Sequence, residues 1–298
     1  MSAPVGAPLL ERGVVSLREE VMPGVWLLRL HSPRIARAGL PGQFVHIQCA
    51  DGTDPLLRRP FSFCDIDTAA GTYDILFNVV GRGTAILAAA EAGQMFEALG
   101  PLGHPFSFPE TGAVLAVAGG LGVAPFPLVA RAARERGLEF HWVNGAYTAH
   151  QLLPLEHLPG VSESSSLATD DGSAGYRGFV TDLLKRDALD WLTNTAVIHA
   201  CGPTPMLTSL ARLLGELDER GVDVPRCEVS LEAPMGCALG TCLGCVLPSS
   251  DGGFARVCIE GAVMDWRDID WARLAGMGEL ITHRVAVAHL APEARVAG

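Results

Sequence analysis

The sequence predicts a multi-domain α+β protein with an antiparallel β-barrel, an α/β domain built on a parallel sheet, and a small cysteine-rich domain. Short strand-like runs separated by Gly, Pro and Asp fill about the first hundred residues. Apolar runs then alternate with helical patterns, and three cysteines follow within nine residues. At 298 residues the chain is long enough for several domains. We place the domains at 1–108, 109–225 and 226–298.

The composition is that of a globular, acidic protein. Hydrophobic residues make up 49% of the chain, charged residues 18%, and the formal net charge is −11. Such a charge disfavours binding to nucleic acid or to an anionic membrane surface. The N-terminus lacks the basic segment and apolar stretch of a signal peptide, so we expect a cytoplasmic protein, in which structural disulfides are rare.

One long uncharged run, at 112–130, has the length of a membrane span. It contains "AGGLGVAPFP", and this content of Gly and Pro predicts a strand, a loop and the start of a helix instead. We therefore expect no membrane association.

The barrel is predicted from four strand-like runs and one helical run. The spacing of the strands is typical of a small barrel or sandwich. The strand-like runs are 24–33, 42–50, 61–67 and 72–80, and the short helix is expected at 83–93.

The α/β domain is predicted from three buried strands, each followed by a helical pattern. This alternation indicates a parallel sheet with helices on both faces. The strands are expected at 113–120, 138–147 and 195–203, and the helices at 124–137, 179–192 and 204–221; residues 162–166 have the composition of a loop.

The cysteines of the third domain have the spacing C-x4-C-x2-C-x12-C, which is the pattern of plant-type [2Fe–2S] proteins. Glycines between them let the backbone approach a cluster closely. The four candidate ligands are Cys237, Cys242, Cys245 and Cys258. The other four cysteines, Cys49, Cys64, Cys201 and Cys227, are expected to be small buried residues.

Zinc and a redox pair remain alternatives for these thiols. Zinc sites usually show two short C-x2-C pairs, and here only Cys242 and Cys245 form one. A thioredoxin-like pair would not need the other two thiols.

The segment "LRRPFSF" (57–63) lies at the end of one barrel strand and carries groups suited to a flavin. Arg59 offers a fixed charge for a phosphate, Phe61 an aromatic ring for a planar ligand, and Ser62 a hydroxyl for a ring nitrogen. The alternative is an exposed arginine beside a core phenylalanine.

The segment "VVGRGTA" (79–85) places a glycine-rich turn at the start of a short helix. Free N–H groups there would let Gly83 and Thr84 bind a pyrophosphate. An ordinary strand–turn–helix connection is equally compatible with so short a motif.

Two glycine-containing loops follow strands of the predicted parallel sheet, where ligands of such sheets bind. One loop, in 116–126, carries Gly119, Gly120 and Gly122 without the G-x-G-x-x-G pattern; the other, in 199–207, carries Gly202 and Pro203. Both are candidates for holding the diphosphate of a nicotinamide dinucleotide.

The loop "TDDGSAG" (169–175) adds two carboxylates. Asp170 or Asp171 could bind an adenine ribose, and the charge would repel a 2′-phosphate. The alternative is that both aspartates form the turn that Asp-Gly sequences favour.

Taken in order, these motifs resemble the ferredoxin–NADP reductase superfamily, and within it the electron-transfer subunits of NAD-dependent class 1B dihydroorotate dehydrogenases. The resemblance extends over residues 12–272 and includes Glu232 and Met235 in the lead-in to the cysteines. Two departures are Asn78 and Ala238, where relatives commonly have Arg and Gly.

The resemblance implies FAD in the barrel, NAD in the α/β domain and [2Fe–2S] in the third domain. The implied flavin contacts are Arg59, Pro60, Phe61, Ser62, Leu76, Phe77, Asn78, Gly83 and Thr84. No side chain need act as an acid, base or nucleophile. Ser62 would orient the flavin, and Cys201 would lie near the nicotinamide.

The implied function is a redox relay in pyrimidine (UMP) biosynthesis. Electrons would pass from an FMN-containing dihydroorotate dehydrogenase partner, in a heterotetramer of two plus two chains, through [2Fe–2S] and FAD to NAD⁺. One alternative is an NAD(P)H:ferredoxin or sulfur/polysulfide oxidoreductase subunit of the same architecture. Another, from a different class, is a zinc-binding interaction module.

Overall fold

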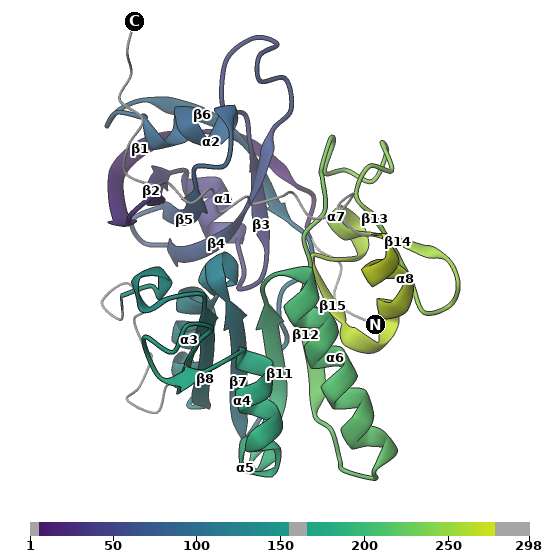
Figure 1. Cartoon of the computed structure of the whole chain (residues 1–298). Helices are drawn as coiled ribbons and strands as arrows, with labels where there is room; N and C mark the ends of the chain where they lie inside the picture. Colours follow the sequence, from purple (N-terminus) through teal and green to yellow (C-terminus); the bar gives the residue numbers. More distant parts are fainter. Residues whose placement is uncertain (1–5, 155–165, 278–298) are drawn as a thin grey trace, which may run out of the picture.

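The computed structural model describes residues 6–154 and 166–277. It confirms the predicted fold class: a barrel lies above an α/β domain, and the C-terminal elements lie beside both (Figure 1). The tail after residue 277 and most of the predicted loop at 162–166 lie outside the described residues.

The barrel is closed and antiparallel. Its strand order is β1 (Leu9–Met22), β2 (Val25–His31), β5 (Thr72–Asn78), β4 (Arg59–Asp67), β3 (Phe44–Ile47) and β6 (Met95–Leu102). The helices α1 (Pro33–Ala38) and α2 (Arg82–Ala88) pack on it, and α2 is shorter than the predicted helix at 83–93.

Two barrel strands, β1 and β6, were not among the predicted runs. Strand β1 carries exposed charged side chains through much of its length, so it lacks the apolar alternation of a half-buried strand. Strand β6 contains Gly100 and Pro101 near its end, and these residues are typical of a turn.

The second domain is a seven-stranded sheet. Its order is β10 (Tyr176–Arg177), β9 (Ser166–Thr169), β8 (Glu139–Ala146), β7 (Ala113–Gly119), β11 (Thr195–Cys201), β12 (Arg226–Ser230) and β15 (Val263–Asp265). All neighbouring pairs are parallel except β12 with β15.

Helices cover both faces of this sheet, as the continuous apolar strand β7 predicts. Leu115 and Val117 belong to the core on the side of α4 (Val180–Arg186) and α6 (Thr204–Glu219). Val114 and Ala116 belong to the core on the side of α3 (Phe126–Glu135). The predicted helix at 179–192 is split, because α4 ends at Arg186 and α5 (Ala188–Leu192) follows Asp187.

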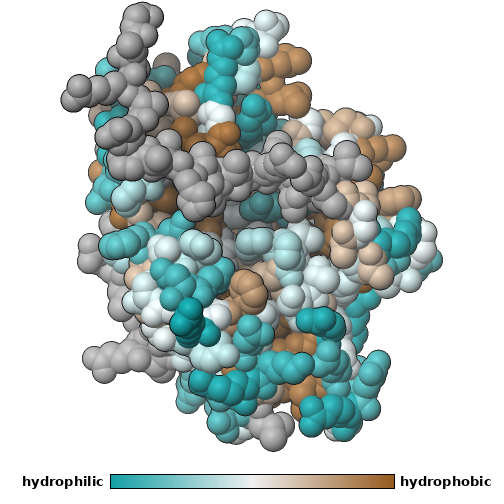
Figure 2. All heavy atoms as spheres, viewed as in Figure 1, coloured by the Kyte–Doolittle hydropathy of each residue, from teal (hydrophilic) through white to brown (hydrophobic). Residues whose placement is uncertain are grey.

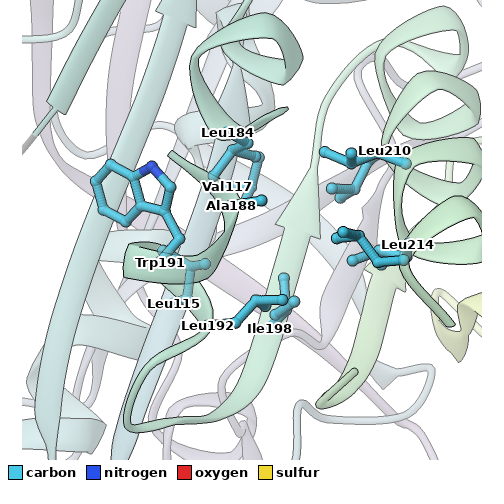
Figure 3. A pocket seen from close by; sticks show the side chains of 11 residues that line it. Leu115, Val117, Leu184, Ala188, Trp191, Leu192, Ile198, Leu210 and Leu214 are labelled. Atoms are coloured by element: carbon cyan, nitrogen blue, oxygen red, sulfur yellow. The ribbon is translucent and has the colours of Figure 1, made fainter. Parts of the chain in front are cut away.

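A narrow apolar cavity of about 20 Å³ lies between the sheet and α4, α5 and α6. Figure 3 shows Leu184, Trp191, Leu210 and Leu214 among the side chains that surround it. The lining offers almost no polar surface, so we interpret the cavity as a packing defect rather than a ligand site.

The C-terminal part continues the sheet and then adds a small unit. Strand β12 pairs with β11 directly after the domain boundary expected at residue 226. The cysteine loop follows, and then β13 (Val246–Pro248), β14 (Phe254–Arg256), α7 (Val257–Glu260), β15, the short 3₁₀ helix η4 (Trp266–Asp268) and α8 (Trp271–Gly276).

No helix in the described ranges is both long and apolar enough to cross a membrane. The uncharged run at 112–130 forms β7, the 3₁₀ helix η1 (Gly120–Val123) and the start of α3, as predicted.

Candidate functional site

The four cysteines of the C-x4-C-x2-C-x12-C pattern lie together as two pairs of thiols. Three are on the loop between β12 and β13, and Cys258 is on α7. The Sγ atoms of Cys245 and Cys258 are 3.2 Å apart, too far for a disulfide. The thiols of Cys237 and Cys242 are hydrogen-bonded to each other. Because each iron of a two-iron cluster takes two protein ligands, this pairing suits [2Fe–2S].

The spacing of the cysteines is what distinguishes a two-iron cluster from zinc. Zinc sites usually show two short C-x2-C pairs, and here only Cys242 and Cys245 form one.

The loop backbone is shaped so that its N–H groups point at sulfur. The N–H groups of Leu239 and Cys242 donate to Cys237 Sγ at 3.3 and 3.4 Å. The N–H of Gly244 donates to Cys242 Sγ at 3.4 Å. Such bonds stabilise thiolates and tune a bound cluster.

These hydrogen bonds change the acidity of one thiol. Burial alone would raise the pKa of Cys237, but hydrogen bonds from the Thr241 hydroxyl and from the N–H groups of Leu239 and Cys242 lower it to about 6. Burial and the neighbouring Cys245 raise the pKa of Cys258 to about 12. The exposed side of the loop thus favours the thiolate that a metal requires.

Apolar side chains are exposed around the cysteine loop. They are Leu239, Leu243, Phe254 and Ile259. Leu243 and Phe254 also line an open groove of about 480 Å³ together with Val246, Arg256 and Glu260. Figure 2 shows brown and tan atoms on this side of the molecule, where Figure 1 places the C-terminal elements. Exposed apolar area of this kind is typical of an interaction surface.

The flavin motif lies on β4, where successive side chains point to opposite sides. Arg59 is half-buried, and within the described chain its guanidinium bonds only to carbonyl oxygens, those of Leu57 and Arg58, at 2.6 and 3.2 Å. Its charge is therefore free for a phosphate. Pro60 and Ser62 point to the opposite side of the strand from Arg59, and the Ser62 hydroxyl makes no hydrogen bond within the described residues.

Phe61 is a side chain of the barrel core. It is only 8% exposed and lies 5.5 Å from the ring of Phe77. Its contact with a flavin stays a prediction.

Strand β5 ends with a polar atom that lacks a partner. Asn78 Oδ1 is buried and accepts no hydrogen bond within the described residues. A buried acceptor of this kind is costly unless a ligand or water satisfies it. On the same strand, Leu76 belongs to one hydrophobic cluster with Val123 and Cys201, and β5 contacts η1 of the first glycine loop.

The turn before α2 is closely packed around Gly83. A Cβ at this position would lie 3.2 Å from Cys49 Sγ and 3.3 Å from Arg59 Cγ, so the glycine lies directly against the arginine of the flavin motif. The Thr84 hydroxyl accepts hydrogen bonds from the N–H groups of Val80 and Gly81 at 2.9 and 3.2 Å, which fixes the turn.

The two glycine loops of the α/β domain contact each other at the carboxyl ends of β7 and β11. A Cβ at Gly122 would lie 2.2 Å from Cys201 O, and one at Gly119 would lie 2.4 Å from Met206 Sδ and 3.3 Å from Pro203 Cδ. Gly202 likewise lies against Met206. Gly122 is therefore required for packing between the loops, whatever they bind, because it meets backbone, whereas Gly119 and Gly202 face mainly the flexible end of Met206.

Gly120 differs from its neighbours. It has a φ of 55°, and a Cβ there would meet nothing within 4 Å. This open backbone, at the first residue of η1 and ahead of α3, is the part of the loop that a dinucleotide could approach.

The two aspartates lie at the carboxyl end of β9 and have different surroundings. Asp171 accepts hydrogen bonds from the N–H and hydroxyl of Ser173 at 2.9 and 2.6 Å, which is the turn-forming role. Burial and the charge of Asp171 raise the pKa of Asp170. Asp170 is therefore the better candidate for a ribose.

The sequence did not single out two exposed aromatic residues near these aspartates. The N–H of Asp171 donates to the carbonyl of Tyr147, and Phe179 begins α4 beside Gly178, whose N–H donates to Thr169 O. Large exposed aromatics at a sheet's ligand edge are the signal that could have identified them.

Cys201 ends β11 and is buried. Burial raises the pKa of its thiol to about 12, and the charge of Glu232 acts in the same direction. The thiol is therefore neutral and serves as a packing and hydrogen-bonding group rather than a nucleophile.

Comparisons with known proteins match this geometry. Residues 232–270 match the family model for the iron–sulfur cluster binding domain of dihydroorotate dehydrogenase B. Residues 116–212 match the oxidoreductase NAD-binding domain.

Curated relatives extend the match to most of the chain. The electron transfer subunit of dihydroorotate dehydrogenase B (NAD(+)) from Desulforamulus reducens is 37% identical, over 84% of this chain and 94% of its own. The chain belongs to this family. The same subunit from Geobacillus thermodenitrificans is 38% identical, over 85% of this chain and 95% of its own. The expected class, an oxidoreductase subunit of dihydroorotate dehydrogenase B, is thereby confirmed.

Solved structures agree on the fold. The NADH-dependent reduced ferredoxin-NADP oxidoreductase superposes with a TM-score of 0.77 at 27% identity, over 89% of this chain and 91% of its own. A ferredoxin NADP⁺ reductase from Neisseria gonorrhoeae, solved with bound FAD and NADP, superposes with a TM-score of 0.59 at 17% identity, over 70% of this chain and 91% of its own.

Proposed function

We propose that this chain carries electrons between a dihydroorotate-oxidising partner and NAD⁺, using a [2Fe–2S] cluster and FAD. The observation that carries the proposal is the adjacency of the three sites. Strand β12 runs beside β11, which ends at Cys201 and the glycine loops, and β12 leads directly to the paired thiols. Leu76 of the barrel belongs to the same hydrophobic cluster as Cys201 and Val123.

The chemistry belongs to the cofactors. When bound, the cluster exchanges single electrons, the flavin one or two, and the nicotinamide a hydride. The protein holds and orients these groups and excludes water from them.

Each site is assigned to residues of this chain. Arg59, Gly83 and Thr84 would hold the flavin pyrophosphate. The other flavin contacts would be Pro60, Ser62, Leu76, Phe77 and Asn78, with Phe61 supporting them from the barrel core. Gly120, Asp170 and the loops around Gly119, Gly122, Gly202 and Pro203 would hold NAD. The cluster ligands would be Cys237, Cys242, Cys245 and Cys258.

The partner that this function requires is the catalytic subunit of dihydroorotate dehydrogenase B, with FMN, in a heterotetramer of two plus two chains. The exposed apolar residues around the cysteine loop are where we place its docking surface, because electrons enter or leave through the nearby cluster. The complex would act in the cytoplasm, in pyrimidine biosynthesis.

A single thiol substitution tests the relay. In Cys242→Ser, assembled with the catalytic subunit, we expect dihydroorotate-dependent NAD⁺ reduction to be lost, while NADH oxidation by an artificial dye at the flavin is largely retained. The matched control is Cys227→Ala, a buried thiol outside the ligand set, which should keep both activities. Equal loss of both activities in Cys242→Ser would contradict the order of the relay.

A second candidate is favoured by the structural neighbour with the TM-score of 0.77, which is an NADH-dependent reduced ferredoxin-NADP oxidoreductase. In that case the partner would be a ferredoxin or a related acceptor. NADH-driven reduction of ferredoxin, with no orotate formed by the reconstituted complex, would favour this candidate.

A further inference from the structure

Arg256 connects the two halves of the thiol set. Its Nη1 donates to the carbonyl oxygen of Gly240, in the loop between Cys237 and Cys242, at 3.3 Å. Its Nε donates to both carboxylate oxygens of Glu260 at 3.2 and 3.1 Å. Glu260 is the last residue of α7, the helix that carries Cys258.

The guanidinium lies directly against the loop backbone. A Cβ added at Gly240 would lie 3.1 Å from Arg256 Nη1, and Gly240 has a φ of 75°. Glu260 Oε2 also accepts the backbone N–H of Arg256 at 2.7 Å, so the same carboxylate holds both the backbone and the guanidinium of Arg256. The side chain is thus held at both ends.

Arg256 also lies at the junction of the two segments that carry the thiols. It directly precedes α7 and lies two residues before Cys258. The next residue, Val257, donates its N–H to the carbonyl of Cys245 at 2.9 Å. Together with the bond to Gly240, these contacts place the guanidinium against the cysteine loop and next to the helix that carries Cys258.

We propose that Arg256 and Glu260 set the reduction potential of the iron–sulfur cluster: Arg256 stabilises the added electron, and Glu260 positions Arg256 and offsets its charge. The inference rests on the proposed function, because it requires the cluster. Reduction adds one negative charge to the four-thiolate site, so a nearby cation favours the reduced form and a nearby anion opposes it.

Arg256 and Glu260 also line the groove beside the cysteine loop, together with Leu243, Val246 and Phe254. Water in this open groove screens both charges. A partner that covers the groove would remove that water, so the potential should respond more strongly to these charges in the complex than in the isolated chain.

The test is a reductive titration of the cluster with dithionite, followed by electron paramagnetic resonance, on the full chain assembled with its catalytic subunit. Dithionite supplies the single electron that the cluster takes up. At a fixed potential, we expect Arg256→Gln to lower the ratio of reduced to oxidised cluster by about three- to tenfold; tenfold corresponds to about 59 mV for a one-electron couple. Glu260→Gln should raise the ratio, because it leaves the cation uncompensated.

Two further variants separate charge from packing. Arg256→Lys keeps the charge and loses the forked contacts, so its potential should lie closer to wild type than that of Arg256→Gln. The double variant Arg256→Gln/Glu260→Gln should return near the wild-type potential. A purely structural pair would instead shift both single variants in the same direction.

Iron and acid-labile sulfide are measured in every variant. Shifts of the same sign in both single variants, no shift at full cluster occupancy, or loss of iron in Glu260→Gln and Arg256→Lys alike would overturn the inference. Absence of iron from the wild-type chain would instead overturn the proposed function, so the two failures are distinct.

Discussion

Ala238 and Leu243 lie in a backbone region that residues with a side chain rarely adopt. Both have a φ of 57°, on either side of Gly240 and Cys242. Each such residue costs about 1–2 kcal/mol and persists only where the surroundings require it. Here the requirement is the loop that directs N–H groups at the thiols.

This loop conformation predicts that substitutions at residues 240 and 238 have opposite effects on iron binding. Gly240→Ala should lose bound iron, because its Cβ would lie 2.7 Å from Ile259 Cγ1 at a φ of 75°. Ala238→Gly should keep the iron and change the free energy of unfolding by less than about 1 kcal/mol, because relief of strain offsets the lost buried methyl. Iron analysis and thermal unfolding measure both. Full iron occupancy in Gly240→Ala would contradict this account.

A second prediction concerns the contact between the nucleotide loops. Gly122→Ala would place a Cβ 2.2 Å from Cys201 O, so the loops must separate. We expect a loss of about 2–4 kcal/mol in stability and a weaker affinity for NADH. Chemical denaturation and NADH titration provide the measurements.

The matched control for that substitution is Gly215→Ala in α6. A Cβ there meets nothing within 4 Å, so alanine should stabilise the helix by up to about 1 kcal/mol. If both substitutions had the same effect, the loop contact would not be what requires Gly122.

Among individual residues, the sequence predicts those that are identified by their spacing along the chain. The four cysteines could be predicted, because one loop and one later thiol suffice for the ligand set. Arg256 and Glu260 could not, because their relation to Gly240 depends on how α7 folds back on the loop. Phe61 was ambiguous because a core aromatic and a ligand-facing aromatic look alike in sequence.

Among the elements, the buried parallel strands were the most predictable. Strand β7 is buried throughout, and its residues alternate between two helix-covered faces, which a continuous apolar run predicts. Strand β1 was missed because its outer face is charged and exposed. The break between α4 and α5 at Asp187 has no Gly or Pro to indicate it.

The packing of α6 on the sheet leads to a third prediction. Leu214 is buried and lines the narrow cavity shown in Figure 3. Leu214→Ala would enlarge this cavity and should lower the free energy of unfolding by about 2–5 kcal/mol. The exposed neighbour Arg212→Ala should change stability by less than about 0.5 kcal/mol. Denaturant unfolding compares the two, and equal losses would show that α6 does not pack as described.

At the scale of the whole molecule, a buried polar network holds the segment between β6 and β7 against the sheet of the α/β domain. Glu228 of β12 accepts hydrogen bonds from the N–H and hydroxyl of Ser107, both at 2.7 Å. The ring of His199 lies 2.8 Å from the Ser107 carbonyl and stacks on Phe106. Burial alone would raise the pKa of Glu228, but hydrogen bonds from His199 and Ser107 lower it below its usual value.

This network gives a fourth prediction, with a defined pH dependence. A carboxylate whose pKa is lowered by folding stabilises the protein fully above its unfolded value, and the effect is lost as pH falls through the folded value. The free energy of unfolding of wild type should therefore exceed that of Glu228→Gln by about 1–3 kcal/mol at neutral pH. This difference should shrink below about pH 4.5. Urea unfolding at several pH values measures it. A difference that is constant with pH would contradict the assignment.

The arrangement of the three parts could be predicted only in outline. The motifs predict a barrel, a parallel sheet and a cysteine domain in order. They do not predict that β12 and β15, on either side of the cysteine loop, complete the same sheet. That arrangement depends on pairing between residues far apart in the chain, and it brings the end of β12, from which the cysteine loop departs, next to the end of β11.

The central claim is that the paired thiols hold a two-iron cluster next to a flavin. The most direct test is the visible spectrum of the anaerobically purified chain, with analysis of iron, sulfide, flavin and zinc. The account predicts a brown-yellow protein that contains FAD and about two irons and two sulfides per chain. A colourless protein with stoichiometric zinc and no iron would contradict it.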